Sequence, residues 1–110
     1  MVLTMEVVWS NNALQSAQVA ANYARDEFGD FQVRKLREKI RLAVRKISLM
    51  PSACLLEQNL LRIDPSVQYR YITLFPHLEM IFHEEKEGIC VIDLIWNTRR
   101  NPNALHHLFS

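Results

Sequence analysis

The chain has 110 residues, of which 49% are apolar and 23% are charged, and its formal net charge is only +1. This length and composition are typical of one ordered globular domain, and they exclude a disordered or fibrous chain. No stretch approaches the roughly 18 apolar residues that a membrane span needs, and the first residues lack the pattern of a secretory signal. We therefore predict a single domain over residues 1–110 of a cytoplasmic protein that does not enter a membrane.

The predicted elements begin with a short β-prone segment, TMEVVW, after which Ser10 is suited to cap a helix. From Asn12 onward apolar residues recur at steps of three and four, which predicts an amphipathic helix. Gly29 suits the end of that helix, and Asp30 is suited to cap a second helix that stops before Pro51. The two helices should form a hairpin. Their predicted buried faces are Leu14, Ala17, Ala21, Ala24 and Phe28 in the first, and Val33, Leu36, Ile40, Ala43, Val44 and Ile47 in the second.

Beyond Pro51 the apolar pattern changes. The next residues, SACLLEQNLLRI, fit either a helical turn or an irregular strand, and the DPS triplet predicts a turn. Three β-prone runs follow, QYRYITLF, LEMIFHEE and GICVIDLIW, and they predict an antiparallel meander. The last run is apolar on both faces except at Asp93, which needs a hydrogen-bonded partner. The predicted fold is therefore α+β, with an N-terminal strand and a helical hairpin packed on a small antiparallel sheet of three or four strands.

The two cysteines, Cys54 and Cys90, lie among apolar neighbours and do not show a Cys-x-x-Cys spacing. This pattern favours buried thiols over a disulfide or a pair of metal ligands. We expect neither a metal nor a cofactor.

Positive charge is concentrated in the second predicted helix. Between Arg34 and Lys46 seven residues are basic and one is acidic, although the whole chain has 13 lysines and arginines against 12 acids. A charged amphipathic helix is often only a soluble one, but a stripe of one sign suggests contact with an acidic protein or with nucleic acid. The candidate contact residues, which share one stripe, are Arg34, Arg37, Arg41 and Arg45.

Four segments, in this order, carry a resemblance to a known family: VVWSNNALQSAQVAANYARDEFG, KLREKIRLAVRKISLMPS, YRYITLFPHLEMIFH and ICVIDLIWNTRRNP. Together they cover nearly the whole chain. The chain resembles the RelE/ParE superfamily, the toxin components of bacterial type II toxin–antitoxin systems. The resemblance implies a cytoplasmic toxin that inhibits growth, as in plasmid stabilisation systems, and a small cognate antitoxin whose C-terminal segment wraps around it.

The resemblance leaves the target open between two branches. RelE-like members are ribosome-dependent endoribonucleases that cleave messenger RNA, whereas ParE-like members poison DNA gyrase. The low net charge is unusual for a protein that must neutralise ribosomal phosphates, and the C-terminal tyrosine of the nuclease branch is absent. These are departures from the nuclease branch, and the long first helix and the alanine-lined hairpin resemble the ParE branch more closely. An inactive chain that keeps the fold only to bind an antitoxin is a third alternative.

In the nuclease alternative, arginines would stabilise the phosphate and a histidine would move a proton without a metal. Arg70 lies on the first strand of the meander, and Arg99 and Arg100 follow the last. The structural alternatives are a surface ion pair between Arg70 and Glu79, and a solvated turn at the arginine pair.

The histidines and one glutamate complete this set. His83 lies on the second strand of the meander, and Glu57 could imitate the carboxylate base of other nuclease toxins. Adjacent helical residues point about 100° apart, so at most one of His106 and His107 faces a site. The candidate catalytic residues are Arg70, His83, Arg99, Arg100 and His107.

Overall fold

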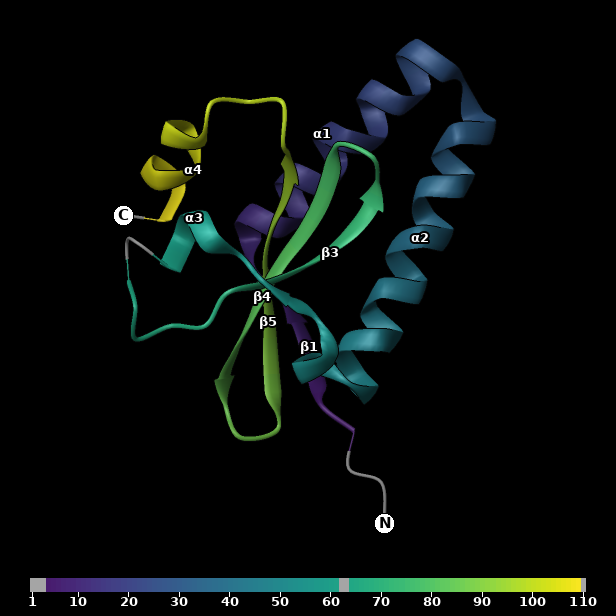
Figure 1. Ribbon diagram of the computed structural model, residues 1–110. Helices are drawn as coiled ribbons and strands as arrows, with labels where there is room; N and C mark the ends of the chain where they lie inside the picture. Colours follow the sequence, from purple (N-terminus) through teal and green to yellow (C-terminus); the bar gives the residue numbers. More distant parts are fainter. Residues whose placement is uncertain (1–3, 62–63, 110) are drawn as a thin grey trace.

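The computed structural model describes residues 4–61 and 64–109 and has an α+β fold, as expected (Figure 1). A first strand leads into a helical hairpin, and a short irregular segment then leads into a meander and a last helix. The elements are β1 (Glu6–Trp9), α1 (Asn11–Phe28), α2 (Asp30–Leu49), the 3-10 turn η1 (Pro51–Ala53), β2 (Leu55–Leu56), α3 (Gln58–Leu61), β3 (Arg70–Phe75), β4 (Leu78–Lys86), β5 (Ile89–Asn97) and α4 (Pro102–Phe109).

The sheet has five strands in the order β1-β5-β4-β3-β2, so the expectation of three or four strands was wrong. It is also mixed, because β1 pairs parallel with β5 while all other neighbours are antiparallel. β2 is only two residues long, too short to leave an alternating pattern in the sequence. β1 and β5 lie at opposite ends of the chain, and no turn signal relates them.

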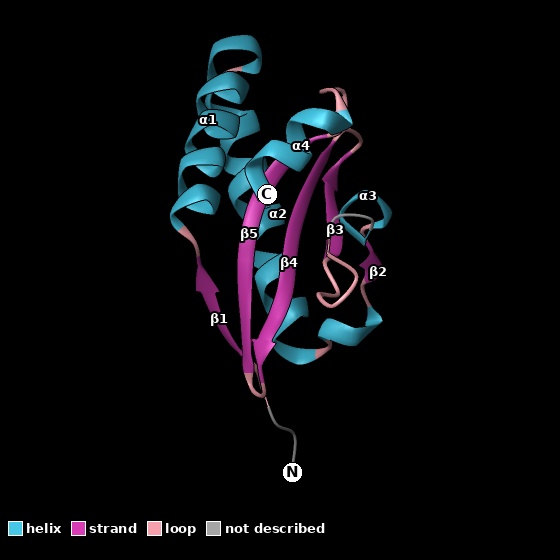
Figure 2. Ribbon diagram, turned by 90° about the vertical axis from the view of Figure 1, so that its left-hand side faces the viewer, coloured by secondary structure: helices cyan, strands magenta, loops and turns pink. Residues whose placement is uncertain are grey.

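Helices cover both faces of the sheet (Figure 2). The α1–α2 hairpin packs on one face, where the main core includes Leu36, Ile47, Phe82 and Ile92. α3 and α4 lie on the opposite face over a smaller core, which consists of Leu60, Ile81, Leu94, Trp96 and Leu105. The apolar character of β5 on both sides is therefore explained by this chain's own helices. No helix within the described ranges is long and apolar enough to cross a membrane.

The helix ends follow the sequence signals closely. The Ser10 hydroxyl accepts a hydrogen bond from the Ala13 N–H at 3.0 Å, which confirms its role as N-cap. Gly29 adopts a positive φ of 84° between the two helices, a conformation that favours glycine. Asp30 is the first residue of α2 rather than its cap, because Gly29 already occupies the capping position.

The buried face of α2 is the predicted one, whereas that of α1 is rotated. Ala13 is fully buried, and Ala17, Ala20, Ala21 and Ala24 pack beside it. The predicted core residues Leu14 and Phe28 are both exposed. Alanines permit a closer approach of α1 to β5 and α2 than larger side chains would, so the small residues face inward.

Cys54 and Cys90 are free, buried thiols, as expected. Burial is the largest factor that raises the pKa of both thiols. They therefore remain protonated members of the main core.

Candidate functional site

The polar groups of greatest interest lie on the sheet face opposite the helical hairpin, which we call the open face because α3 and α4 cover only part of it (Figure 2). Strand β5 bulges there: Ile81 lies opposite Leu94 and Phe82 opposite Ile92, so Asp93 is an extra residue in the pairing. A bulge changes the direction of the side chain that it displaces. Ile92 belongs to the core between the sheet and the hairpin, and Leu94 belongs to the core on the open face. Asp93 lies between these two residues in the sequence, and its carboxylate contacts His83 on β4.

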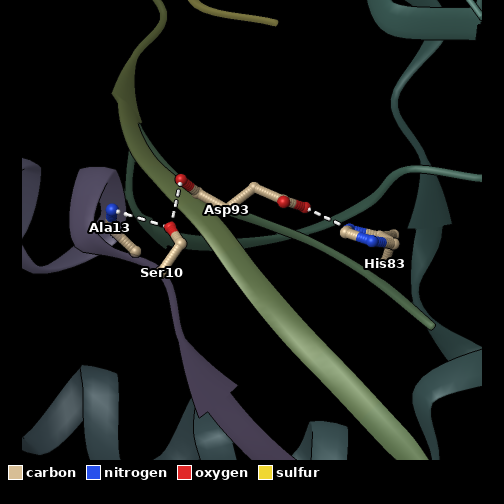
Figure 3. Close-up of polar contacts among 4 residues, drawn as sticks. All are labelled: Ser10, Ala13, His83 and Asp93. Carbon is tan, nitrogen blue, oxygen red and sulfur yellow. Dashed lines mark hydrogen bonds and ion pairs between the residues drawn. The ribbon is translucent and has the colours of Figure 1, made fainter. Parts of the chain in front are cut away.

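The start of α1 holds this bulge in place (Figure 3). The Ser10 hydroxyl donates a hydrogen bond to the Asp93 carbonyl oxygen at 3.1 Å while it accepts from Ala13. Two turns further along α1, the Ser16 hydroxyl accepts from the Ile95 N–H at 2.9 Å. Beyond the end of β1, helix α1 therefore satisfies backbone groups of β5 that a strand would otherwise pair, and it fixes the backbone of Asp93.

His83 and Asp93 form a close, partly buried pair. The His83 Nδ1 and Asp93 Oδ2 atoms are 2.7 Å apart, and the two side chains are only 18% and 14% exposed. The hydrogen bond to Asp93 raises the pKa of His83 against the opposing effect of burial. Burial raises the pKa of Asp93, although the hydrogen bond to His83 opposes this. Because Nδ1 faces the carboxylate, Nε2 is the ring nitrogen left to exchange a proton with a ligand.

Aromatic side chains connect this pair to the end of α4. The Tyr69 ring packs edge-on against His83, with 5.3 Å between the ring centroids, and against Phe109 of α4 at 5.0 Å. Burial is the largest factor that raises the pKa of Tyr69, and the nearby Asp93 charge adds to it. Tyr69 therefore remains a neutral side chain that shields one side of the pair.

Two cavities lie on either side of the pair. One of about 540 Å³ has His83 and Arg70 in its wall, and one of about 220 Å³ at the start of α1 has Asp93 in its wall. The larger cavity carries charges of both signs, so its field is not strongly positive. Its charged lining residues besides Arg70 are Glu84, Glu85, Lys86 and Glu87.

Arg70 is engaged in holding the backbone of a neighbouring segment. Its Nη1 donates to the carbonyl oxygens of Cys54 at 2.7 Å and Ser52 at 3.5 Å, and its Nη2 donates to the Gln68 side chain at 3.5 Å. The alternative of an ion pair with Glu79 does not fit the register, which places Arg70 opposite Phe82. Arg70 thus lines the same cavity as His83, but much of its guanidinium group is occupied by hydrogen bonds within the fold.

The arginine pair lies at the far end of the sheet from His83. Asn97, at the end of β5, pairs with Leu78, whereas His83 pairs with Val91, six positions earlier on the same strand. Six residues of strand span about 20 Å. Arg99 and Arg100 are exposed in the turn beyond, and the Arg100 guanidinium lies 5.1 Å from the centre of the Trp96 ring. The structure therefore does not gather these arginines around His83.

The C-terminal histidines lie on α4. His107 is exposed, while the side chain of His106 lies outside the described residues.

Glu57 is part of a second carboxyl pair on the open face. It is buried after β2, and its carboxylate accepts from the Asn59 N–H at 3.2 Å. The pKa of Glu79 is raised to about 7. Burial is the largest cause, and the charge of the nearby Glu57 and a hydrogen bond with it add to the effect. Glu79 therefore exchanges its proton near neutral pH, beside the Glu57 carboxyl group. This pair could not be predicted from the sequence, because Glu57 lies in a segment whose apolar residues follow no clear period.

The four candidate contact arginines of α2 are all exposed. Helix α2 packs on the hairpin face of the sheet, whereas His83 lies on the open face. The sheet therefore separates these arginines from His83. Within the described part of the chain, Arg41 is the one of the four with an acidic partner, Glu38 at 2.6 Å. The basic stripe and the His83–Asp93 pair are therefore two separate surfaces.

The chemistry available on the open face is acid–base chemistry. A histidine held by a carboxylate can take up and release a proton near neutral pH. Across residues 4–61 and 64–109, no group of three or more histidine, cysteine, aspartate and glutamate side chains is placed to hold a metal ion.

Comparisons with known proteins place the fold. No family model matches the sequence, and no curated protein matches it significantly. A search of solved structures finds similarity to a chain in a structure described as "Chromosomal ParDE TA system from P. aeruginosa", with a TM-score of 0.65 and 17% sequence identity. The match covers 86% of this chain and 96% of that one. The expected RelE/ParE-like fold is thus confirmed, and the sheet is larger than predicted.

Proposed function

We propose that this chain is the toxin of a toxin–antitoxin pair, neutralised by a small cognate antitoxin, and that it poisons DNA gyrase by contact, as ParE-like proteins do. The observation that carries the proposal is the likeness of fold to a chain of a ParDE system, which extends over almost the whole length of both chains. A protein that inhibits growth in this way acts in the cytoplasm, where its target lies.

The distribution of charged groups favours contact over catalysis. A metal-free nuclease needs cations gathered about the phosphate that it cleaves. Here the Arg70 guanidinium binds backbone carbonyls, and Arg99 and Arg100 lie at the other end of the sheet. Three glutamates line the cavity beside His83, which disfavours a polyanion there.

The second candidate function is cleavage of messenger RNA on the ribosome, and the His83–Asp93 pair is the observation that favours it. With Asp93 bound to Nδ1, His83 would take the proton from a ribose hydroxyl through Nε2. Arg70, in the wall of the same cavity, would stabilise the charged phosphate. Arg99, Arg100 and His107 would have to contribute from outside this cavity.

Induction in a bacterial host without antitoxin distinguishes these functions. The wild-type chain and a His83→Gln/Asp93→Asn double variant are expressed, and both transcript integrity and gyrase-dependent DNA breaks are measured. We expect DNA breaks with both proteins and intact transcripts. Transcripts cleaved by the wild type and spared by the variant would establish the nuclease instead, and normal growth with both proteins would indicate an inactive antitoxin-binding chain.

A further inference from the structure

Helix α2 carries apolar side chains on its outer face as well as on its buried face. Phe31, Leu42 and Leu49 are 60%, 47% and 44% exposed. They lie eleven and seven positions apart, about three and two helical turns, so they share one line along the helix, on which Glu38, the ion-pair partner of Arg41, also lies. At about 100° per residue, this line points away from the buried stripe that contains Leu36 and Ile47. Single exposed apolar residues are ordinary, but an aligned set marks an interaction surface.

Basic residues flank this line on both sides. At about 100° per residue, the four arginines lie along one side, namely Arg34, Arg37, Arg41 and Arg45. Lys35, Lys39 and Lys46 lie along the other. Near the start of α2, the Arg34 guanidinium and the Lys35 ammonium lie 5.9 Å and 4.8 Å from the centre of the Phe31 ring. We define the α2 stripe as Phe31, Leu42 and Leu49 together with the flanking basic residues Arg34, Lys35, Arg37, Lys39, Arg41, Arg45 and Lys46.

The described part of the chain leaves the outer side of α2 uncovered. In Figure 1 the helix runs along the edge of the molecule, and the sheet lies on its inner side only. A second copy of the chain is a poor occupant, because two α2 stripes would bring like charges together. The partner must therefore supply both apolar side chains and negative charge.

We infer that the α2 stripe is the docking site of an amphipathic helix with an apolar seam and acidic flanks, and that the antitoxin supplies this helix. An apolar seam on the partner would pack on Phe31, Leu42 and Leu49 at the same helical spacing, as in other helix-to-helix interfaces. Acidic flanks would pair with the arginines and lysines and steer association. A nucleic acid backbone would meet the charges but would leave the apolar line against phosphates. This inference rests on the proposed function, since it assigns a place to the antitoxin.

The proposed function expects a small antitoxin to be encoded beside this chain, and the test measures binding of the full chain to that neighbouring protein, by titration calorimetry at two salt concentrations. A Leu42→Ser/Leu49→Ser variant should bind at least about tenfold more weakly, since it removes apolar surface that the partner would bury and puts hydroxyl groups in its place. Val19→Ser is the control, because Val19 is an apolar residue on α1 that is even more exposed, at 68%, and lies outside the α2 stripe. Arg37→Glu/Arg45→Glu should slow association, most of all at low salt.

Each outcome of these measurements either supports or overturns the inference. Weaker binding by the leucine variant and unchanged binding by the Val19 control support the inference. Equal binding by all variants, with growth arrest still relieved by the partner, overturns the inference and leaves the proposed function standing. If the neighbouring protein neither binds the wild-type chain nor relieves its arrest, the proposed function fails as well. Binding of a DNA or RNA duplex that depends on the arginines, with partner binding unaffected, would assign the stripe to nucleic acid and also overturn the inference.

Discussion

The proton held between His83 and Asp93 links the stability of the fold to pH. The pKa of His83 is raised in the folded chain, whereas an unperturbed histidine titrates near about 6.5. The stabilisation from the pair is therefore complete below this pH and is lost as the pH rises through the folded-state pKa. The free energy of unfolding of the wild type should fall over that interval.

Urea unfolding between about pH 6 and 9 checks this expectation against the His83→Gln/Asp93→Asn variant. The two amides can keep a hydrogen bond in place of the ion pair but do not titrate, so the fall should be smaller in the variant. Glu79 titrates in both proteins, so its contribution to the pH dependence cancels when the two free energies of unfolding are subtracted. Equal pH dependence of the two proteins would show that the pair does not contribute.

The Glu57–Glu79 pair makes a second, separate prediction. The folded-state pKa of Glu79 is about 7 against an ordinary value of 4.5, so the stability associated with its proton is lost as the pH rises through this range. Glu79→Gln should therefore stabilise the protein at pH 8, by about 1 kcal/mol once solvent screening of this part-exposed group is allowed for. At pH 5 the variant and wild type should be nearly equal.

The control for this prediction is Glu84→Gln, at an exposed position on the same strand. It should change the free energy of unfolding little at either pH. A Glu79→Gln variant that is no more stable than wild type at pH 8 would rule out the raised pKa of Glu79.

Part of this residue-level detail could be predicted from the sequence. A charged residue inside an apolar strand must be paired, so a partner for Asp93 was expected. The identity of this partner was not expected. A regular tight hairpin around Glu87 and Gly88 would place His83 opposite Ile92, but two irregularities in the register place it opposite Val91. The shift at Asp93 leaves no mark in the sequence.

At the scale of the elements, the orientation of α1 is the main departure from expectation. Both Leu14 and its neighbour Ala13 fit a helical apolar face, and the structure buries the smaller residue. Ala13→Leu should destabilise the fold by about 1–3 kcal/mol, since overpacking displaces neighbouring atoms. Leu14→Ala should change stability by no more than about 0.5 kcal/mol. Thermal or urea unfolding of the two variants checks this, and the reverse ranking would contradict the observed face.

Elements with a clear period and clear caps could be predicted, namely both long helices and the three strands of the meander. The segment after Pro51 could not, because it divides into η1, a two-residue strand and a four-residue helix, each too short to show a period. The parallel pairing of β1 with β5 depends on the packing of the whole hairpin and is likewise absent from any local pattern.

At the scale of the whole molecule, two surfaces lie on opposite sides of one sheet. The His83–Asp93 pair occupies the open face and the α2 stripe faces outward from the hairpin. Sites without shared contacts contribute independently. The His83→Gln/Asp93→Asn and Leu42→Ser/Leu49→Ser changes, combined in one chain, should therefore add in unfolding free energy within about 0.5 kcal/mol. A larger deviation in urea unfolding would show that the sheet couples the two surfaces.

The central proposal is that this chain acts as a toxin and that a small protein encoded beside it neutralises it. The most direct measurement is the count of viable bacteria after induction of the wild-type chain, alone and together with that protein. We predict that viability falls when the chain is expressed alone and is restored by co-expression. Undiminished viability with the chain alone, at confirmed levels of folded protein, would contradict the account.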